Sequence, residues 1–142
     1  METYSKLVTE KEFLFTMIAS NEGISPKLIS WKRVNGKYII ESEKYPRMLL
    51  DEPVWNLYKE DAVKLLNKLH SLGIFHSDIT EENFVVNPTT KEIKLIDFGC
   101  SCWIDSITID QVENTYNGSA ITICELLALE IKEIQWLCNQ KK

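Results

Sequence analysis

The chain has 142 residues, of which 44% are hydrophobic and 26% are charged, and its formal net charge is -5. This size and composition fit one globular domain, and the mild acidity argues against nucleic acid as the main partner, because such binding normally requires a basic stripe. No apolar run approaches the roughly 18 residues of a membrane span, and the N-terminus lacks the pattern of a secretory signal. We therefore expect no membrane partner and a cytoplasmic protein.

The first element that the sequence predicts is a helix after Thr9. Thr9 is a suitable N-cap, and Glu12 follows at the spacing of a capping box. Apolar residues then recur up to Ser20, and residues 21–23 end the helix with a glycine.

Two strands joined by a tight turn are expected next. Residues 24–31 lead into the first strand, Asn35-Gly36 is a hairpin turn, and residues 37–41 form the returning strand. Residues 48–57 are rich in polar and turn residues, so we expect them to connect this hairpin to a later helix.

A helix followed by a second hairpin is predicted in the middle of the chain. Residues 62–75 have apolar side chains at helical spacing, with Gly73 near their end. Residues 84–96 contain two apolar runs separated by Asn87-Pro88, which indicates a β-hairpin.

Polar residues that can support phosphoryl transfer flank this hairpin. Asp78 lies in a short loop before it, Asn83 follows five residues later, and Asp97 comes directly after it. Both aspartates have apolar neighbours in the sequence, and a carboxylate in such surroundings is costly unless it is paired or bound to metal. Phosphoryl transfer needs one group to orient the attacking hydroxyl and oxygen ligands for Mg²⁺. The alternative for the aspartates is a solvated loop carboxylate, and for Asn83 a simple loop cap.

The spacing H-x-D-x-x-x-x-N from His76 to Asn83, followed by D-F-G at 97–99, resembles the signature of protein kinases. The resemblance implies an α+β, protein-kinase-like fold in a single domain, residues 1–142. Residues 1–45 would form an abbreviated small lobe of one helix and two or more strands. Residues 46–142 would form a reduced, mainly helical large lobe.

The resemblance also assigns roles to the residues of the motif. Asp78 is expected to be catalytic, and Asn83 and Asp97 are expected to bind the cofactors ATP and Mg²⁺ as metal ligands, with Mn²⁺ as an alternative ion. His76 is expected to be structural, as are Phe98 and Gly99, which complete the D-F-G sequence.

Two further sets of residues are matched less directly. Glu12 corresponds to the glutamate that partners the phosphate-anchoring lysine, although a capping-box residue on a solvated first turn explains it equally well. Residues 41–46 correspond to the hinge between the lobes, whose backbone would meet the adenine ring. The hinge places Glu41, Ser42 and Glu43 among the expected nucleotide-binding residues.

The chain departs from the kinase pattern at several positions. It contains no G-x-G-x-x-G, and only eight residues precede Thr9, without a strand that resembles V-A-I-K. Lys6, the only lysine before the helix, could reach phosphates only if the N-terminal segment folds back. Thr80 stands where common protein kinases have a lysine, which is similar to small atypical kinases such as the RIO family and the kinase of the KEOPS complex.

The C-terminal part resembles the family only loosely. Residues 100–116 have the length of an activation segment, and residues 117–125 resemble the passage that closes it. An apolar-rich helix is expected from Ala120 to Trp136, and Lys141 and Lys142 end the chain.

Two functions remain open at this point. The first is a minimal ATP-dependent Ser/Thr protein kinase whose partners are ATP and a protein substrate. The second is a catalytically impaired pseudokinase or kinase mimic that binds a full kinase or its complex. A homodimer is an open alternative, and compact relatives of this kind are familiar from viral genomes, in which case the location would be the host cytoplasm.

Overall fold

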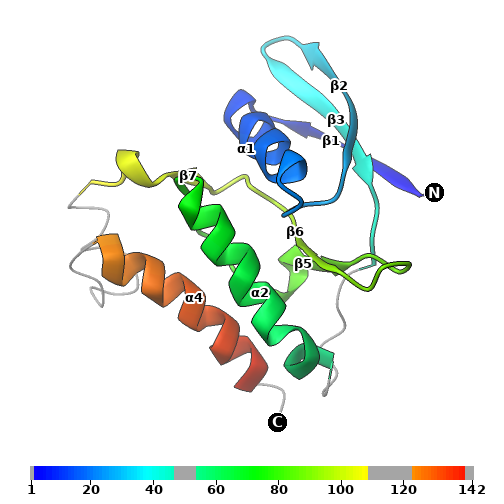
Figure 1. The fold of residues 1–142 in the computed structure, drawn as a ribbon. Helices are drawn as coiled ribbons and strands as arrows, with labels where there is room; N and C mark the ends of the chain where they lie inside the picture. Colours follow the sequence, from blue (N-terminus) through cyan, green and yellow to red (C-terminus); the bar gives the residue numbers. More distant parts are fainter. Residues whose placement is uncertain (1, 47–53, 109–122, 140–142) are drawn as a thin grey trace.

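The computed structural model describes residues 2–46, 54–108 and 123–139, which form two lobes (Figure 1). The small lobe contains β1 (Thr3–Val8), α1 (Glu10–Asn21), β2 (Leu28–Val34) and β3 (Lys37–Glu43). The described part of the large lobe contains α2 (Val54–Ser71), β4 (Ile74–Phe75), η1 (Glu81–Asn83), β5 (Phe84–Val86), β6 (Ile93–Leu95), β7 (Cys102–Trp103), η2 (Ile104–Ser106) and α4 (Ile123–Asn139). The expected α+β composition, with one helix in the small lobe, is confirmed.

The strands of the small lobe form an antiparallel sheet in the order β1-β3-β2. Lys6 of β1 and Trp31 of β2 both lie opposite Ile40 of β3, so these three residues share one face of the sheet. That face packs on α1, where Phe13 stacks on Tyr38 with ring centroids 4.2 Å apart. α1 therefore covers one face of the sheet only, as Figure 1 shows.

The local sequence accounts for both ends of α1. The Thr9 hydroxyl accepts a hydrogen bond from the Glu12 amide at 3.2 Å, which is the predicted N-cap. At the other end, Gly23 adopts a φ of +75°, and the chain turns so that Ile24 N donates to Ala19 O at 2.9 Å.

The core of the molecule extends across both lobes. Phe15 of α1 is fully buried in a cluster with Leu66 and Leu69 of α2. The ring centroids of Phe15 and Trp103 lie 4.9 Å apart in an edge-to-face arrangement. Leu95 N donates to Ile24 O at 2.8 Å, which joins β6 to the small lobe. α2 and α4 lie side by side beneath this core (Figure 1).

Three boundaries differ from the sequence-based predictions. α2 begins at Val54, so residues 54–57 are helical rather than part of a connection. Pro53 directly precedes this start in the sequence, and a proline is well tolerated there because the first helical amides need no acceptor in the helix. β3 extends to Glu43, so the first three residues of the expected hinge belong to a strand. The N-terminal segment, predicted to carry no lysine-bearing strand, forms β1.

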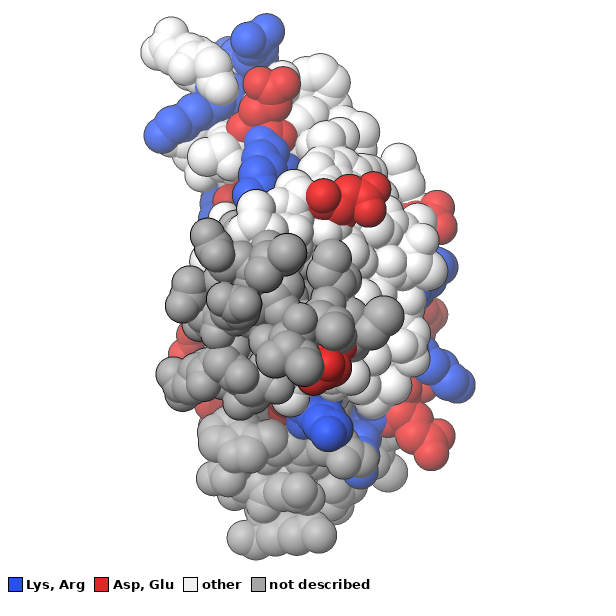
Figure 2. Space-filling model, turned by 90° about the vertical axis from the view of Figure 1, so that its left-hand side faces the viewer, with Lys and Arg blue, Asp and Glu red and all other residues white. Residues whose placement is uncertain are grey.

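Some predicted features lie outside the described residues. They include residues 109–116 of the expected activation segment and residues 117–122 of the passage that was compared with its end, as well as the two C-terminal lysines. Within the described ranges, no helix is both long enough and apolar enough to span a membrane. On the face shown in Figure 2, Lys and Arg side chains lie among Asp and Glu side chains, so the described residues of that face carry both signs.

We predict that Phe15→Ala lowers the free energy of unfolding by about 3 to 5 kcal/mol, because it leaves a cavity in a core shared by both lobes. Leu14→Ala on the same helix is the matched control, since Leu14 is 42% exposed, and its effect should stay within about 0.5 kcal/mol. Urea unfolding followed by circular dichroism measures both. Equal losses in the two variants would contradict this core assignment.

Candidate active site

A cavity of about 640 Å³ lies between the two lobes. Its walls come from β1, α1, the end of β3 and the β5–β6 hairpin with the residues that follow it. The residues used below that line it are Lys6, Glu12, Ser42, Glu43, Tyr45, Asn83, Asp97 and Phe98. This volume is within the range of small-molecule sites in proteins.

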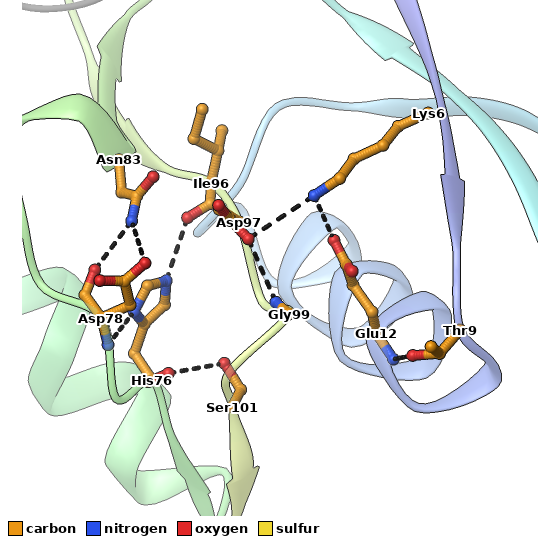
Figure 3. A network of polar contacts seen from close by, with 10 residues as sticks. All are labelled: Lys6, Thr9, Glu12, His76, Asp78, Asn83, Ile96, Asp97, Gly99 and Ser101. Atoms are coloured by element: carbon orange, nitrogen blue, oxygen red, sulfur yellow. Dashed lines mark hydrogen bonds and ion pairs between the residues drawn. The ribbon is translucent and has the colours of Figure 1, made fainter.

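Three charged side chains from three separate segments meet at one side of this cavity (Figure 3). Lys6 Nζ of β1 lies 2.6 Å from Glu12 Oε2 of α1 and 3.5 Å from Asp97 Oδ1, which follows β6. Burial by itself favours the neutral amine, but the hydrogen bond to Glu12 and the charges of Glu12 and Asp97 outweigh it and raise the pKa of Lys6. Lys6 therefore carries a fixed positive charge into the cavity.

The backbone around Asp97 brings its carboxylate toward Lys6. Asp97 has a φ of +66°, and Asp97 Oδ1 accepts a hydrogen bond from Gly99 N at 3.2 Å. A Cβ atom on Gly99 would lie 3.3 Å from both Asp97 Oδ1 and Glu12 Oε1. The glycine therefore allows the two carboxylates to approach the same stretch of backbone.

Asn83 also lines the cavity, and Asp78 lies directly beside it. Asn83 Nδ2 donates to Asp78 O at 2.8 Å and to Asp78 Oδ2 at 3.2 Å. This leaves the amide oxygen of Asn83 turned away from Asp78 (Figure 3). Asp78 is partly exposed, so its carboxylate is accessible to a second molecule.

His76 supports this loop from within the core. The ring is fully buried, its Nδ1 accepts from Asp78 N at 3.1 Å, and its Nε2 donates to Ile96 O at 3.0 Å. Burial lowers the pKa of His76, against the opposing influence of the Ile96 carbonyl and nearby carboxylates. A neutral ring with one donor and one acceptor nitrogen matches both bonds, and it connects the segments that carry Asp78 and Asp97.

A fully buried carboxylate that the sequence analysis missed also holds this loop. Glu130 of α4 accepts from His76 N at 3.2 Å and Ser77 N at 2.7 Å, and His70 Nε2 of α2 lies 2.8 Å from Glu130 Oε1. Two amides are thereby satisfied where Ser77 adopts a φ of +74°. The only sign of Glu130 in the sequence is that it is a charged residue within the apolar pattern of the last helix.

The oxygen atoms available at the cavity suit a hard divalent cation. Asp97 Oδ2 and the Asn83 amide oxygen have no hydrogen-bond partner within the described part of the chain, and both residues line the cavity. Carboxylate, amide and water oxygens are the ligands that Mg²⁺ prefers. No group of three or more His, Cys, Asp or Glu side chains able to hold a metal occurs among the described residues, so such an ion would take its other ligands from substrate and water.

The end of β3 forms another wall of the cavity. Ser42 is buried and Glu43 lies beside it, and both line the cavity. Tyr45 follows, and burial together with the Glu43 carboxylate raises the pKa of its hydroxyl to about 12. Its hydroxyl donates to Glu43 and accepts from Asn87 Nδ2 at 3.3 Å. Glu41 differs from these residues, because it does not line the cavity and bonds to Thr3 and Ser30 on the opposite face of the sheet.

The structure thus brings most of the sequence-predicted nucleotide- and metal-binding residues to one cavity. Asp78 does not line it and is joined to it through its hydrogen bond with Asn83. Two further differences concern Glu41 and Lys6. Glu41 lies outside the cavity, because the strand alternation that buries Ser42 turns Glu41 the other way. Lys6, which the sequence analysis placed at the cavity only if the N-terminal segment folds back, lies inside it. The pairing of β1 with β3 supplies that folding back.

Comparisons with known proteins agree with this geometry. The family described as "Protein kinase domain" matches residues 11–120. The serine/threonine-protein kinase pim-2 of Danio rerio is 29% identical over 101 residues, which covers 63% of this chain and 33% of that protein. A probable serine/threonine-protein kinase of Dictyostelium discoideum is 31% identical over 118 residues, which covers 83% of this chain and 8% of that protein. The chain therefore spans a third or less of these two relatives.

Among solved structures, the fold is similar to that of the Cydia pomonella granulovirus kinase PK-1, with a TM-score of 0.62. The likeness covers 93% of this chain and 58% of the viral kinase, at 18% sequence identity. At this identity the likeness concerns the fold alone.

We predict that the free energy of unfolding falls by up to about 1 kcal/mol through His76 when the pH drops from about 7.5 to 5.5. The pKa of His76 in the folded chain lies below 6.5, so the unfolded chain takes up a proton first as the pH falls. Urea unfolding of the wild type and of His76→Gln at both pH values measures this. The wild type should lose more stability than the variant, and an equal loss in both would contradict the prediction.

Proposed function

This chain belongs to the protein kinase family, and we propose that it is a minimal ATP- and Mg²⁺-dependent Ser/Thr protein kinase. One observation carries the proposal. The Lys6 cation, held by Glu12 and Asp97, lines one cavity together with Asn83, whose amide nitrogen donates to the Asp78 carboxylate. Protein kinases transfer a phosphoryl group mainly by positioning and charge stabilisation, and this cavity contains the groups for both.

The phosphates would lie near Lys6. Its fixed charge offsets the negative charge of the nucleotide, and Glu12 holds the amine at 2.6 Å so that little reorganisation is needed. Asn83 and Asp97 would hold Mg²⁺, which neutralises charge on the phosphates when it is bound. The backbone near Ser42 and Glu43 would then meet the adenine ring.

The attacking hydroxyl would come to Asp78. Its partly exposed carboxylate can accept the hydrogen bond of a Ser or Thr hydroxyl, while Asn83 Nδ2 fixes its orientation from the other side. Below it, the buried His76 and Glu130 hold the backbone of the loop in place. Transfer would form a bond between the substrate oxygen and the γ-phosphorus, break the bond from that phosphorus to the bridging oxygen so that ADP leaves, and pass the hydroxyl proton to Asp78.

The alternative is a pseudokinase or kinase mimic that acts by binding a full kinase or its complex. Its support is that the 142 residues contain no G-x-G-x-x-G, and that Thr80 replaces a lysine near the transferred group. Lys6 weakens this alternative, because it supplies a cation at the place where the phosphates would lie. Thr80 is also the basis on which we propose a likeness to the RIO and KEOPS-type kinases. A cytoplasmic location is a separate proposal.

We predict that ATP binds in a Mg²⁺-dependent manner, and that Asp97→Ala weakens this binding at least about tenfold, because it removes a carboxylate ligand. Calorimetric titration with and without Mg²⁺ measures the effect. Asp105→Ala is the matched control, since Asp105 is exposed on η2 and does not line the cavity. An absence of ATP binding by the wild type would overturn the enzyme proposal for this chain.

We further predict that Asp78→Asn lowers the turnover number by about 10²- to 10⁴-fold and leaves the KM for ATP nearly unchanged, because Asp78 acts on the hydroxyl and not on the nucleotide. Transfer of labelled phosphate to a panel of Ser and Thr peptides measures this. Glu82→Gln, an exposed carboxylate four residues away, is the control. ATP binding without any transfer by the wild type would favour the pseudokinase alternative.

A further inference from the structure

The sheet of the small lobe has a second face that α1 does not cover. Along β3, Tyr38 and Ile40 point toward α1 and belong to its apolar cluster. Because side chains alternate along a strand, Lys37, Ile39 and Glu41 lie on the opposite face. We call this opposite face of β1, β2 and β3 the outer face.

The centre of the outer face is apolar and exposed. Leu7 of β1 lies directly opposite Ile39 of β3, and these side chains are 56% and 40% exposed. Directly opposed residues of an antiparallel pair have neighbouring side chains, so the two form one continuous apolar surface.

Charges of opposite sign lie on either side of this apolar centre. Lys37 precedes Ile39 by two residues and Glu41 follows it by two, so the cation and the anion are separated by roughly 13 Å along β3. The Glu41 carboxylate is held in place by the hydroxyls of Thr3 at 3.1 Å and Ser30 at 3.3 Å. The order along the strand is therefore a cation, an apolar side chain and an oriented anion.

We propose that the outer face binds the outer face of a second copy of this chain, with the two β3 strands antiparallel. The two-fold axis for this arrangement passes beside Ile39, parallel to the sheet and perpendicular to the strands. It places Ile39 on Ile39 and Leu7 on Leu7. The same rotation places Lys37 of each copy over Glu41 of the other. Such an isologous contact is self-complementary, as closed dimers require.

The charge order selects this arrangement over its alternative. A two-fold axis parallel to the strands would place Lys37 over Lys37 and Glu41 over Glu41, and like charges in contact are unfavourable. The antiparallel arrangement brings one pair of like charges together. Lys32 of the edge strand β2 lies opposite Ile39, so Lys32 of one copy would lie over Lys32 of the other. Lys32 is exposed at the rim of the face, where a long side chain can extend into water.

The small size of the outer face predicts a weak dimer. Three short strands cover less than the roughly 1,200 Å² that stable interfaces bury in total, so we expect a dissociation constant on the order of tens of micromolar. The contact leaves the cavity open, because Lys6 and Ser42 lie on the face that packs toward α1. The proposal therefore does not depend on catalytic activity.

Sedimentation velocity of the wild type from about 5 to 500 µM tests the proposal together with charge reversals. Lys37→Glu and Glu41→Lys should each weaken self-association at least tenfold. An equimolar mixture of these two variants should associate again, because positions 37 and 41 then carry opposite charges wherever the two copies meet. Lys32→Ala should strengthen the dimer by removing the like-charged pair.

Thermal unfolding of each variant verifies that it is folded, and Leu7→Ser provides a second test at the apolar centre that does not involve charge. A wild type that stays monomeric up to 500 µM would overturn the proposal. Self-association that neither the charge reversals nor Leu7→Ser weakens would also overturn it, because the contact would then lie elsewhere. Association of the mixed variants no stronger than that of either one alone would refute the antiparallel arrangement.

Discussion

The Lys6–Glu12 ion pair is the interaction on which the two sides of the cavity depend. It joins the edge strand β1 to α1 at 2.6 Å, and the same amine reaches Asp97 at 3.5 Å. Three segments distant in sequence are thereby brought around one charge. An exposed ion pair is worth little, but Glu12 is mostly buried, so leaving its carboxylate without Lys6 would cost considerably more than the pair contributes at a surface.

Glu130 has a similar structural role in the large lobe to that of Glu12 in the small lobe. It is a buried carboxyl group without a lysine or arginine partner among the described residues, and it accepts hydrogen bonds from two backbone amides and lies 2.8 Å from His70 Nε2. One carboxylate at the cavity, Glu12, therefore holds a side-chain cation, and another, the buried Glu130 outside the cavity, holds a loop. The first fixes where negative charge on a ligand is compensated, and the second fixes where Asp78 stands.

The sequence was informative where short-range patterns determine structure, and it was uninformative where long-range pairing does. The loop from Asp78 to Asn83 and the Thr9 cap depend on residues close in sequence, so spacing predicted them. Lys6 became part of the cavity only through pairing of β1 with β3, more than thirty residues away. Glu130 likewise acts 54 residues from His76. Glu41 was expected to bind the nucleotide because the strand was predicted to end at residue 41. β3 in fact continues to Glu43, and its alternation turns the Glu41 side chain away from the cavity.

At Gly99, side chains from both lobes approach the same point of the backbone. A single added carbon there would press on a small-lobe carboxylate and a large-lobe carboxylate at once, each 3.3 Å away. A side chain at this position would therefore require the two carboxylates to move apart by a few tenths of an ångström. A methyl group at this position would push the Glu12 and Asp97 carboxylates apart. The effect of such a substitution on activity would show how closely the two lobes must approach each other.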